Sequence, residues 1–391
     1  MNKKLSLAVA GAVLAFGASA ANAGITIPAG DWTIDIGGNV NTFYTRTNTD
    51  AALETNGDDV QNIRTGLLPS AIGIGGKTRQ NDLDVAFQFT FFVGADDGAG
   101  AGGAGTAAGN NSLNIRQAFG SFGDASWGTI KFGRDLGIYG SDAILSDMTL
   151  LGVGVGATGS GGSSTLGRIG SGYIYADWVG QISYASPNWN GFSFAVGLRD
   201  PWKNGAAGAQ NNDMGYEGKV SYEWAGDFAG KVWLGAISQK ISNDVPGANE
   251  YTAHSVEVGA KVAAGGFGLV GYYYDGKSVD SNANVALLGV GGLPFLTGGA
   301  ETDDDGGYIQ GTFTVPGVGT KLGLSYGVSD SEQDGAGGLE VKNKSWVAGV
   351  YHPLTKSLNL VAEYTDGKLD LNGGLGDIDY DTISLGAIMF F

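Results

Sequence analysis

Alternation of apolar and polar residues with a period of two is the feature that most constrains this sequence. In Leu83–Val93 the odd-numbered residues are all apolar, whereas the residues between them include Asp84, Gln88 and Thr90. Successive side chains of a β-strand point to opposite faces, so the segment predicts a strand with one apolar and one mostly polar face. In Asn114–Phe122 the same pattern puts Ile115 and Phe119 on the apolar face and Arg116 on the wet face.

Segments of this kind recur between turn signals along the whole chain. We predict about sixteen strands, an even number, as in single-chain bacterial outer-membrane barrels. The predicted strands are 32–46, 60–76, 82–93, 112–122, 126–134, 180–186, 191–200, 214–225, 229–241, 251–264, 266–277, 306–315, 319–329, 341–352, 357–368 and 378–391. The expected fold is therefore all-β: a closed transmembrane antiparallel β-barrel.

The predicted connections alternate in length. Short turns such as Gly123–Ala125 alternate with long stretches rich in Gly, Asp and Asn, among them 135–172 and 278–305. Short periplasmic turns and long outer loops are typical of outer-membrane barrels. The acidic run Thr302–Gly306 is expected in an outer loop, and it lacks the spacing of a calcium-binding loop.

The N-terminal residues have the pattern of a secretory signal. Lys3 and Lys4 precede the apolar stretch Leu5–Gly17, and Ala21–Ala23 has the A-x-A form of a cleavage site. The apolar stretch is shorter than the roughly 20 residues that a spanning helix needs. We therefore expect residues 1–23 to be a cleaved signal peptide, 24–391 to be the barrel, and the destination to be the outer membrane.

Composition excludes several other classes. The chain has no cysteine, which rules out a disulfide-stapled fold. Its net charge of −17 argues against nucleic acid as a partner. This acidity does not predict cation preference, because a pore selects by the charges at its narrowest point.

Aromatic residues cluster near the ends of the predicted strands, as in the two interfacial girdles of a barrel. These residues are Trp32, Tyr44, Trp127, Trp224, Trp233, Tyr272–Tyr274, Trp346 and Tyr351. The last strand places Ile383, Leu385, Ala387, Met389 and Phe391 on one face. Its terminal Phe391 resembles the signal by which outer-membrane proteins are recognised for assembly.

Several stretches resemble the general porin family of neisserial and related proteobacterial type. Ser70–Phe89 is similar to that family's second hairpin, and Ile115–Phe119 followed by Gly128–Arg134 is similar to the strands that lead into its constriction loop. Tyr184–Phe192 resembles the turn that follows that loop. One departure is Asp177–Ile182, which stands where the family usually has an Arg and an Asn-Ser pair.

The resemblance implies a pore narrowed by an inward-folded loop at Asp135–Gly172, with acidic loop residues facing a basic wall, and a homotrimer in the outer-membrane lipid. The expected loop carboxylates are Asp135, Asp142 and Asp147, and the expected basic residues are Arg116, Lys131, Arg134 and Arg64. Arg64 faces the lumen only if Pro69 or Leu67–Leu68 shifts the register of its strand. A field between the two sides would select small hydrophilic solutes and ions by size and charge.

Three other functions are to be weighed against a general porin. A barrel enzyme needs a catalytic base, but His254 and His352 have no evident Ser or Asp partner, so no catalytic residue is expected. A substrate-specific channel remains the alternative function, although an inward aromatic track is not obvious. A soluble β protein would not need one consistently apolar face. No cofactor and no metal site are expected.

Overall fold

The computed structural model describes residues 24–49, 59–95, 114–156, 164–201, 213–241, 250–279, 301–334, 338, 340–372 and 376–391. The expected signal peptide, 1–23, lies outside these residues. So do parts of the predicted long connections, including 157–163 of the loop at 135–172 and 280–300 of the connection at 278–305.

The described residues form eighteen strands, all joined in one antiparallel sheet. The strands are β1 (Ile25–Ala29), β2 (Trp32–Thr49), β3 (Asp59–Arg64), β4 (Ser70–Gln80), β5 (Leu83–Val93), β6 (Asn114–Asp124), β7 (Gly128–Leu136), β8 (Trp178–Ala185), β9 (Phe192–Arg199), β10 (Gly215–Trp224), β11 (Ala229–Ile241), β12 (Tyr251–Ala264), β13 (Phe267–Lys277), β14 (Thr302–Thr314), β15 (Lys321–Gln333), β16 (Glu340–Pro353), β17 (Leu358–Leu371) and β18 (Ile378–Phe390). Two short helices, α2 (Ser141–Ser146) and η1 (Met148–Leu151), lie between β7 and β8.

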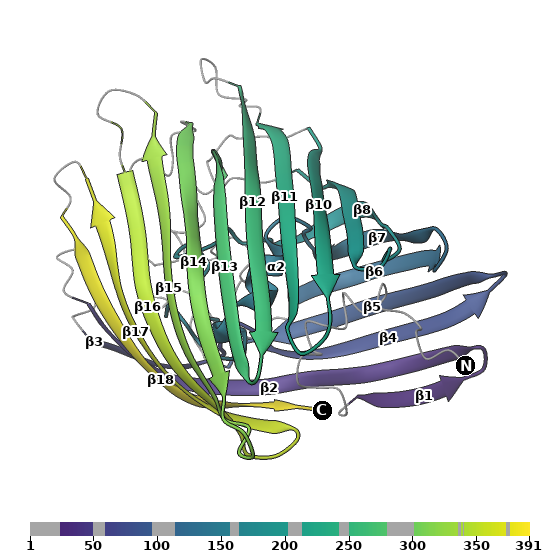
Figure 1. Ribbon diagram of the computed structural model, residues 1–391, viewed down its shortest axis with the longest axis horizontal. Coiled ribbons are helices and arrows are strands. Elements are labelled where there is room, and N and C mark those ends of the chain that lie inside the picture. Colours follow the sequence, from purple (N-terminus) through teal and green to yellow (C-terminus); the bar gives the residue numbers. More distant parts are fainter. Residues whose placement is uncertain are drawn as a thin grey trace.

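The sheet closes on itself because β18 pairs with β2. Two positions in the wall are each shared by two strands: β3 and β4 pair with successive parts of one edge of β2, and β18 and β1 with the other edge. Eighteen strands minus these two duplications give sixteen positions, so the fold is a closed sixteen-strand antiparallel barrel. Figure 1 shows the strands tilted around a common interior.

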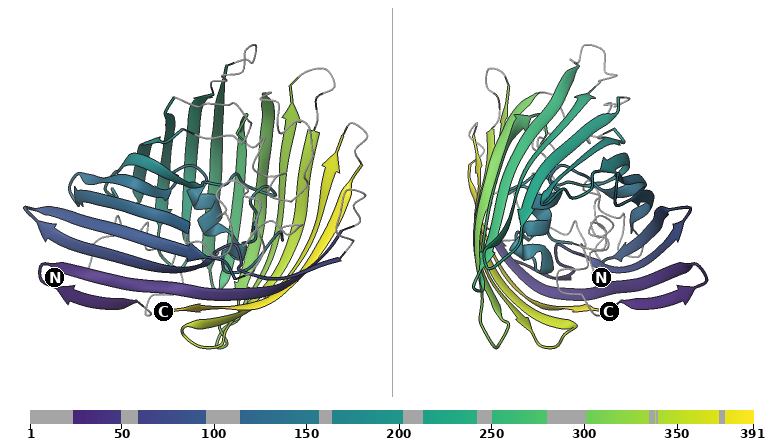
Figure 2. Two further views of the ribbon diagram at one scale, coloured as in Figure 1. Left: turned by 180° about the vertical axis from the view of Figure 1, so that it is seen from behind. Right: turned by 45° about the vertical axis from the view of Figure 1, so that its right-hand side comes forward.

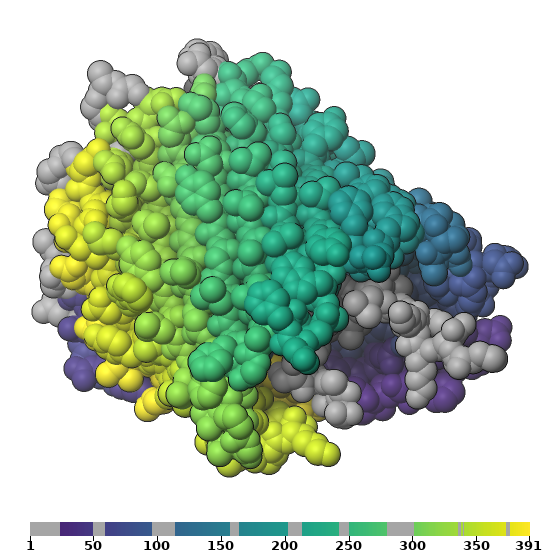
Figure 3. All heavy atoms as spheres, viewed as in Figure 1, coloured from purple at the N-terminus to yellow at the C-terminus, as the bar shows by residue number. Residues whose placement is uncertain are grey.

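The outer face of the wall is apolar along most of its length. Ile182, Leu234 and Leu385 are 60%, 53% and 53% exposed, respectively, which is the arrangement expected of side chains that face lipid. Figure 3 shows this face over the strands from β10 to β17 as a continuous surface. Among the described residues, no helix has the length and apolar character needed to cross a membrane.

The predicted strand 60–76 is broken, which is a correction to the sequence analysis. Residues 65–69 are not strand, and lipid-facing positions change from odd numbers, as at Ile63, to even numbers, as at Ile72 and Ile74. Because side chains alternate along a strand, the break moves the lipid-facing set by one residue. The anticipated register shift is therefore present beside Pro69.

Three further expectations need correction. Strand β1 has no counterpart among the sixteen predicted segments. The acidic run Thr302–Gly306 lies in β14 and not in a loop, because its backbone pairs with β13 and β15. Four of the aromatic residues assigned to the girdles point into the barrel and are at most 5% exposed: Trp233, Tyr272, Tyr274 and Tyr351.

Candidate functional site: the loop inside the barrel

The connection between β7 and β8 lies within the barrel. Figures 1 and 2 show α2 and the coil around it inside the curve of the sheet. The helix Ser141–Ser146 begins after Gly140, whose φ of 74° lies in the left-handed region that glycine adopts without strain. A short helix in this place fills a lumen that is too wide for wall side chains alone to close.

Three wall carboxylates hold the backbone of this loop. Glu217 of β10 accepts the backbone N–H groups of Ile138 and Tyr139, the latter at 2.8 Å. Glu257 of β12 accepts the N–H of Gly140 at 3.0 Å. These bonds satisfy loop N–H groups that would otherwise be buried without partners.

The third carboxylate belongs to Glu363 of β17. It accepts the N–H groups of Val153 at 2.8 Å and Gly154 at 2.7 Å, and the Tyr351 hydroxyl donates to it at 2.6 Å. These three donors together use both oxygens of the carboxyl group, and Glu363 is only 4% exposed. Together with Glu217 and Glu257, Glu363 holds the loop against the wall from β10 to β17.

Arg168 fixes the returning part of the loop. Its side chain is fully buried and donates to Ser325 Oγ of β15 at 2.8 Å and to Ser345 Oγ of β16 at 2.7 Å. Asp147, just before η1, accepts the Arg168 backbone N–H at 3.2 Å and the Tyr173 hydroxyl at 2.8 Å. Burial, with Asp147 beside it, raises the pKa of Tyr173, so this hydroxyl stays a donor.

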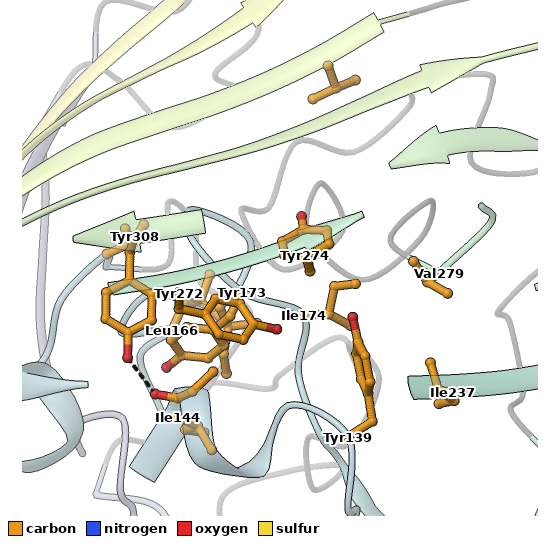
Figure 4. Close-up of a cluster of buried hydrophobic side chains, with 14 of the residues drawn as sticks. Tyr139, Ile144, Leu166, Tyr173, Ile174, Ile237, Tyr272, Tyr274, Val279 and Tyr308 are labelled. Carbon is orange, nitrogen blue, oxygen red and sulfur yellow. Dashed lines mark hydrogen bonds between the residues drawn. The ribbon is translucent and has the colours of Figure 1, made fainter. Parts of the chain in front are cut away.

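A cluster of tyrosines fills the space between the loop and the wall (Figure 4). Tyr308 donates to the Ala143 carbonyl at 2.8 Å, and its ring lies 5.8 Å from those of Tyr272 and Tyr173, centroid to centroid. The sequence analysis did not anticipate inward aromatics. They are covered by the loop, so they pack it against the wall and do not form a track that solute can follow.

Asp142 is the loop carboxylate with the clearest electrostatic role. Lys219 of β10 donates to it at 2.7 Å, and Lys231 of β11 donates to its other oxygen. Burial alone would raise the pKa of Asp142, but the two ammonium groups outweigh it and hold the pKa below its usual range. Two ammonium groups thus share one carboxylate.

Lys261 is a third lysine beside this group. It stands directly opposite Lys231 in the sheet, on the inward face that it shares with Glu257. Among the described residues it has no ion-pair partner within 4.0 Å. Like charges directly opposite each other destabilise a sheet, so this pair costs folding free energy.

Arg116 reaches the interior through a β-bulge. The pairing of β5 with β6 shifts between Thr90 and Phe91, so Arg116 is the extra residue. Its guanidinium carbon lies 4.8 Å from the centroid of the Phe92 ring, and Phe92 is buried inside the barrel. The bulge also turns Phe119, expected on the apolar face, inward, where it is 9% exposed.

Lys131 and Asp135 form an ion pair on the inward face of β7. The Asp135 carboxylate also accepts the Gln117 side-chain amide at 2.9 Å, and only 4% of the side chain is exposed. Asp135 is thus a wall residue at the start of the loop, and Lys131 keeps 30% of its side chain exposed.

The two remaining predicted site residues lie on opposite faces. Arg64 is on the inward face of β3 and is 1% exposed. Arg134 is exposed and shares the face of Phe132, which is 49% exposed toward the outside. Because the strand alternation directs Arg134 outward, its position does not agree with the expected role in the pore wall.

Several residues of this site were not found from the sequence. These residues occupy polar positions of alternating strands, and their charge does not indicate which part of the chain they contact. They are Glu217, Glu257, Glu363, Lys219, Lys231 and Lys261. His254 and His352 lie apart from the loop, and the latter shares a hydrogen bond with Thr320. No group of three or more His, Asp or Glu residues suited to a metal ion occurs in the described part of the chain.

A closed, lipid-facing barrel of sixteen strands whose lumen holds a loop tied to the wall defines an outer-membrane channel protein. The chain matches the family model of Gram-negative porins over residues 8–372, and it belongs to that family. It is an outer-membrane porin, a channel for passive diffusion of small hydrophilic solutes. A comparison with curated proteins gives no match.

Solved structures share the fold at low sequence identity. An anion-selective porin from Comamonas acidovorans is 18% identical with a TM-score of 0.64, and the alignment covers 92% of this chain and all of that one. The outer-membrane channel DcaP of Acinetobacter baumannii is 17% identical with a TM-score of 0.67, covering 95% and 100%. OmpT of Vibrio cholerae, in a trimer form, is 16% identical with a TM-score of 0.58, covering 92% and 99%.

Proposed function

We propose that this porin is a general diffusion channel whose exclusion limit is set by the loop at 135–172 and whose lumenal lysines favour small anions. The observation that carries the proposal is the group formed by Lys219, Lys231 and Lys261, in which Asp142 is the one described carboxylate that forms an ion pair. Glu257, on the same face, accepts hydrogen bonds from Gly140 and Tyr272 instead. A local excess of positive charge in a confined pore raises the concentration of anions there. One structural neighbour is itself described as anion-selective.

Arg116 of β6 and Lys131 of β7 are proposed as further basic residues of the lumen. Both face inward and are only partly buried. Asp142 is proposed as the acidic member of the constriction, whereas Asp147 and Arg168 hold the loop in shape. Arg64 would contribute its positive charge to the field in the lumen without contacting the solute, because its side chain is buried on the inward face.

The reversal potential in a salt gradient across a planar bilayer tests this selectivity. We expect the sign that denotes anion preference, and we expect Lys261→Gln to weaken it. Lys356→Gln is the matched control, because Lys356 is exposed in the turn before β17. Cation preference in the unaltered protein, or equal shifts in both variants, would contradict the proposal.

Liposome swelling with sugars of increasing size tests the general character of the channel. Flux that falls with size and rises linearly with concentration is the expected result. Saturating flux would instead favour the substrate-specific channel.

Export, assembly and the lack of catalysis complete the proposal. Residues 1–23 are proposed to be removed after export, and N-terminal sequencing of the membrane protein should then begin at Gly24.

A homotrimer is proposed because one structural neighbour was solved in a trimer form, and light scattering in detergent measures the mass of the assembly. No catalytic activity is proposed, since neither histidine has the carboxylate and nucleophile of a hydrolase.

A further inference from the structure

The break between β3 and β4 is larger than a simple gap in a strand. In the register of the sheet, Phe43 of β2 stands opposite Arg64, and Asn39 of β2 stands opposite Ala71. The three residues 40–42 of β2 therefore face the six residues 65–70. Every residue from Arg64 to Ala71 is buried, so the surplus turns toward the lumen and not toward lipid. Residues 65–69 are here called the inward bend.

Asn41 takes the place of the sheet hydrogen bonds that the break removes. Its side-chain oxygen accepts the N–H of Gly66 at 2.9 Å, and its side-chain nitrogen donates to the Leu68 carbonyl at 2.8 Å. The same nitrogen donates to the Asn39 side chain at 2.8 Å, and that side chain donates to the Pro69 carbonyl at 3.2 Å. A side-chain amide offers a donor and an acceptor as a peptide unit does, so these two side chains satisfy backbone groups that are buried in the bend.

The inward bend forms backbone hydrogen bonds with two separate parts of the constriction loop. The N–H of Leu67 donates to the Gly152 carbonyl at 2.9 Å, and the Gly66 carbonyl accepts the N–H of Thr165 at 3.3 Å. Gly152 belongs to the outgoing leg of the loop and Thr165 to the returning leg. One short segment that leaves the wall thus contacts both legs.

The leucines of the inward bend pack in two directions. Leu67 is 6% exposed and lies in the buried cluster that contains Leu166 of the returning leg. Leu68 is equally buried and lies in the second cluster, with Phe43 of the wall and Val153 of the outgoing leg. Polar and apolar contacts therefore join the bend to the loop as well as to β2.

A change of register alone does not explain the size of the break. One extra residue moves the lipid-facing set by one position, as the bulge at Arg116 does. The surplus in the break is three residues, six less three, and any odd surplus gives the same change of face. The additional residues bring backbone groups to the loop, so contact with the loop explains the size of the break better than pairing in the sheet does.

We propose that the inward bend positions both legs of the constriction loop from the side of β2 and β4, and that Asn41 is the positioning residue of this contact. Glu363 holds the outgoing leg from β17, through Val153 and Gly154. The leg is therefore held on two sides. The inference rests on the proposed function in one respect, namely that this loop bounds the path of the permeating ions.

Single-channel recordings of Asn41→Ala test the proposal. The variant leaves buried backbone groups of the bend without partners, so we expect the released state of the legs, and with it the low-frequency current noise, to increase about tenfold. Asn359→Ala is the matched control, because Asn359 is an asparagine of the same inward row, where Ile388 of β18 stands between it and Asn41. The reversal potential should stay unchanged in both variants, since the lysines of the lumen lie on β10, β11 and β12.

Amide exchange of the folded porin in detergent locates the release. The N–H groups of Leu67 and Thr165 should exchange about tenfold faster in Asn41→Ala. The N–H of Gly140, which Glu257 accepts, should keep its rate. If Asn41→Ala gives no heat-modifiable barrel, Leu67→Ala replaces it, because this variant removes packing against the returning leg and keeps the bonds that Asn41 makes. Faster exchange of the Thr165 N–H is then the expected result.

Two results would overturn the inference. One is equal noise in Asn41→Ala and Asn359→Ala, which would show that the inward bend does not hold the loop. The other is faster exchange at Gly140 to the same extent as at Leu67, which would show that the whole barrel has loosened. Recordings of Glu363→Ala distinguish this failure from failure of the proposed function. If that variant is noisy and Asn41→Ala is quiet, only the inference fails, whereas two quiet variants would show that the loop does not bound the path.

Discussion

The carboxylate of Glu363 accepts the backbone N–H of Gly154 at 2.7 Å, although 209 positions separate the two residues in the chain. The bond joins the last part of the wall to the loop that enters the lumen. Glu217 and Glu257 make the same kind of contact nearer the start of the loop. The narrow part of this pore is therefore held by acceptors on strands distributed along the second half of the chain.

We expect Glu363→Ala to loosen the loop while the barrel still forms. The N–H groups of Val153 and Gly154 would lose their acceptor, at a cost of about 1–3 kcal/mol for each buried group left unsatisfied. Single-channel recordings should show larger current fluctuations and a raised exclusion limit. Glu223→Ala serves as the control, because Glu223 lies exposed at the end of β10, away from these contacts. Equal noise in both variants would show that Glu363 does not hold the loop.

Asp142→Asn should increase anion preference. Among the described residues, Asp142 is the only carboxylate that forms an ion pair with Lys219 or Lys231, and the substitution removes its charge. One unit charge about 6 Å from a permeating ion in water is worth ~0.7 kcal/mol, or about a threefold change in the permeability ratio. Reversal potentials in a salt gradient measure this ratio, and a shift toward cations would be inconsistent with the charge arrangement.

The attachment of Asp142 should persist in mild acid. Its pKa is lower in the folded protein than in the unfolded chain, so its contribution to stability is fully present above the unfolded value of about 3.9. That contribution is lost only as the pH falls through the lower, folded value. The ratio of the conductance of Asp142→Asn to that of the unaltered protein should therefore be the same at pH 7 and at pH 5, and a ratio that changes between them would contradict this assignment.

Gly66→Ala should destabilise the protein through a close approach of two backbones. A Cβ atom there would lie 2.1 Å from the Gly152 carbonyl oxygen and 2.8 Å from the Phe43 ring, and overpacking of this kind costs about 1–3 kcal/mol. Gly271→Ala is the control, because a Cβ at that position meets nothing within 4 Å. Heat-modifiable gel mobility measures the difference, and equal unfolding temperatures would contradict the steric argument.

The sixteen strand positions of the wall could be predicted from the sequence, because the alternation of apolar and polar residues is visible within each segment. Strands such as 229–241 and 251–264 were predicted with the bounds that the structure has. Alternation failed where the parity of a strand changes. The bulge at Arg116 and the break after Arg64 each move the lipid-facing set by one residue. Pro69 indicated the break as one possibility, whereas nothing in the segment around Arg116 indicated the bulge.

The contacts of the loop could not be predicted for a different reason. Lys219 and Glu257 occupy polar positions that the alternation already explains, so nothing in their own segments indicates a partner more than 70 residues earlier in the chain. Asp142 was named from its charge, but its partners on β10 and β11 follow from the path of the loop across the lumen. Arg134 was assigned to the wall on charge as well, and the strand turns it outward.

The contacts between loop and wall also impose an order on biogenesis. The loop is synthesised before each of the three strands that hold it through a glutamate, from Glu217 in β10 to Glu363 in β17. Until those strands have joined the sheet, the backbone N–H groups that their carboxylates accept, among them those of Tyr139, Gly140 and Gly154, have no acceptor on the wall. The pore therefore reaches its final width only when the barrel is complete. An incomplete barrel would lack the wall carboxylates that hold the loop in place.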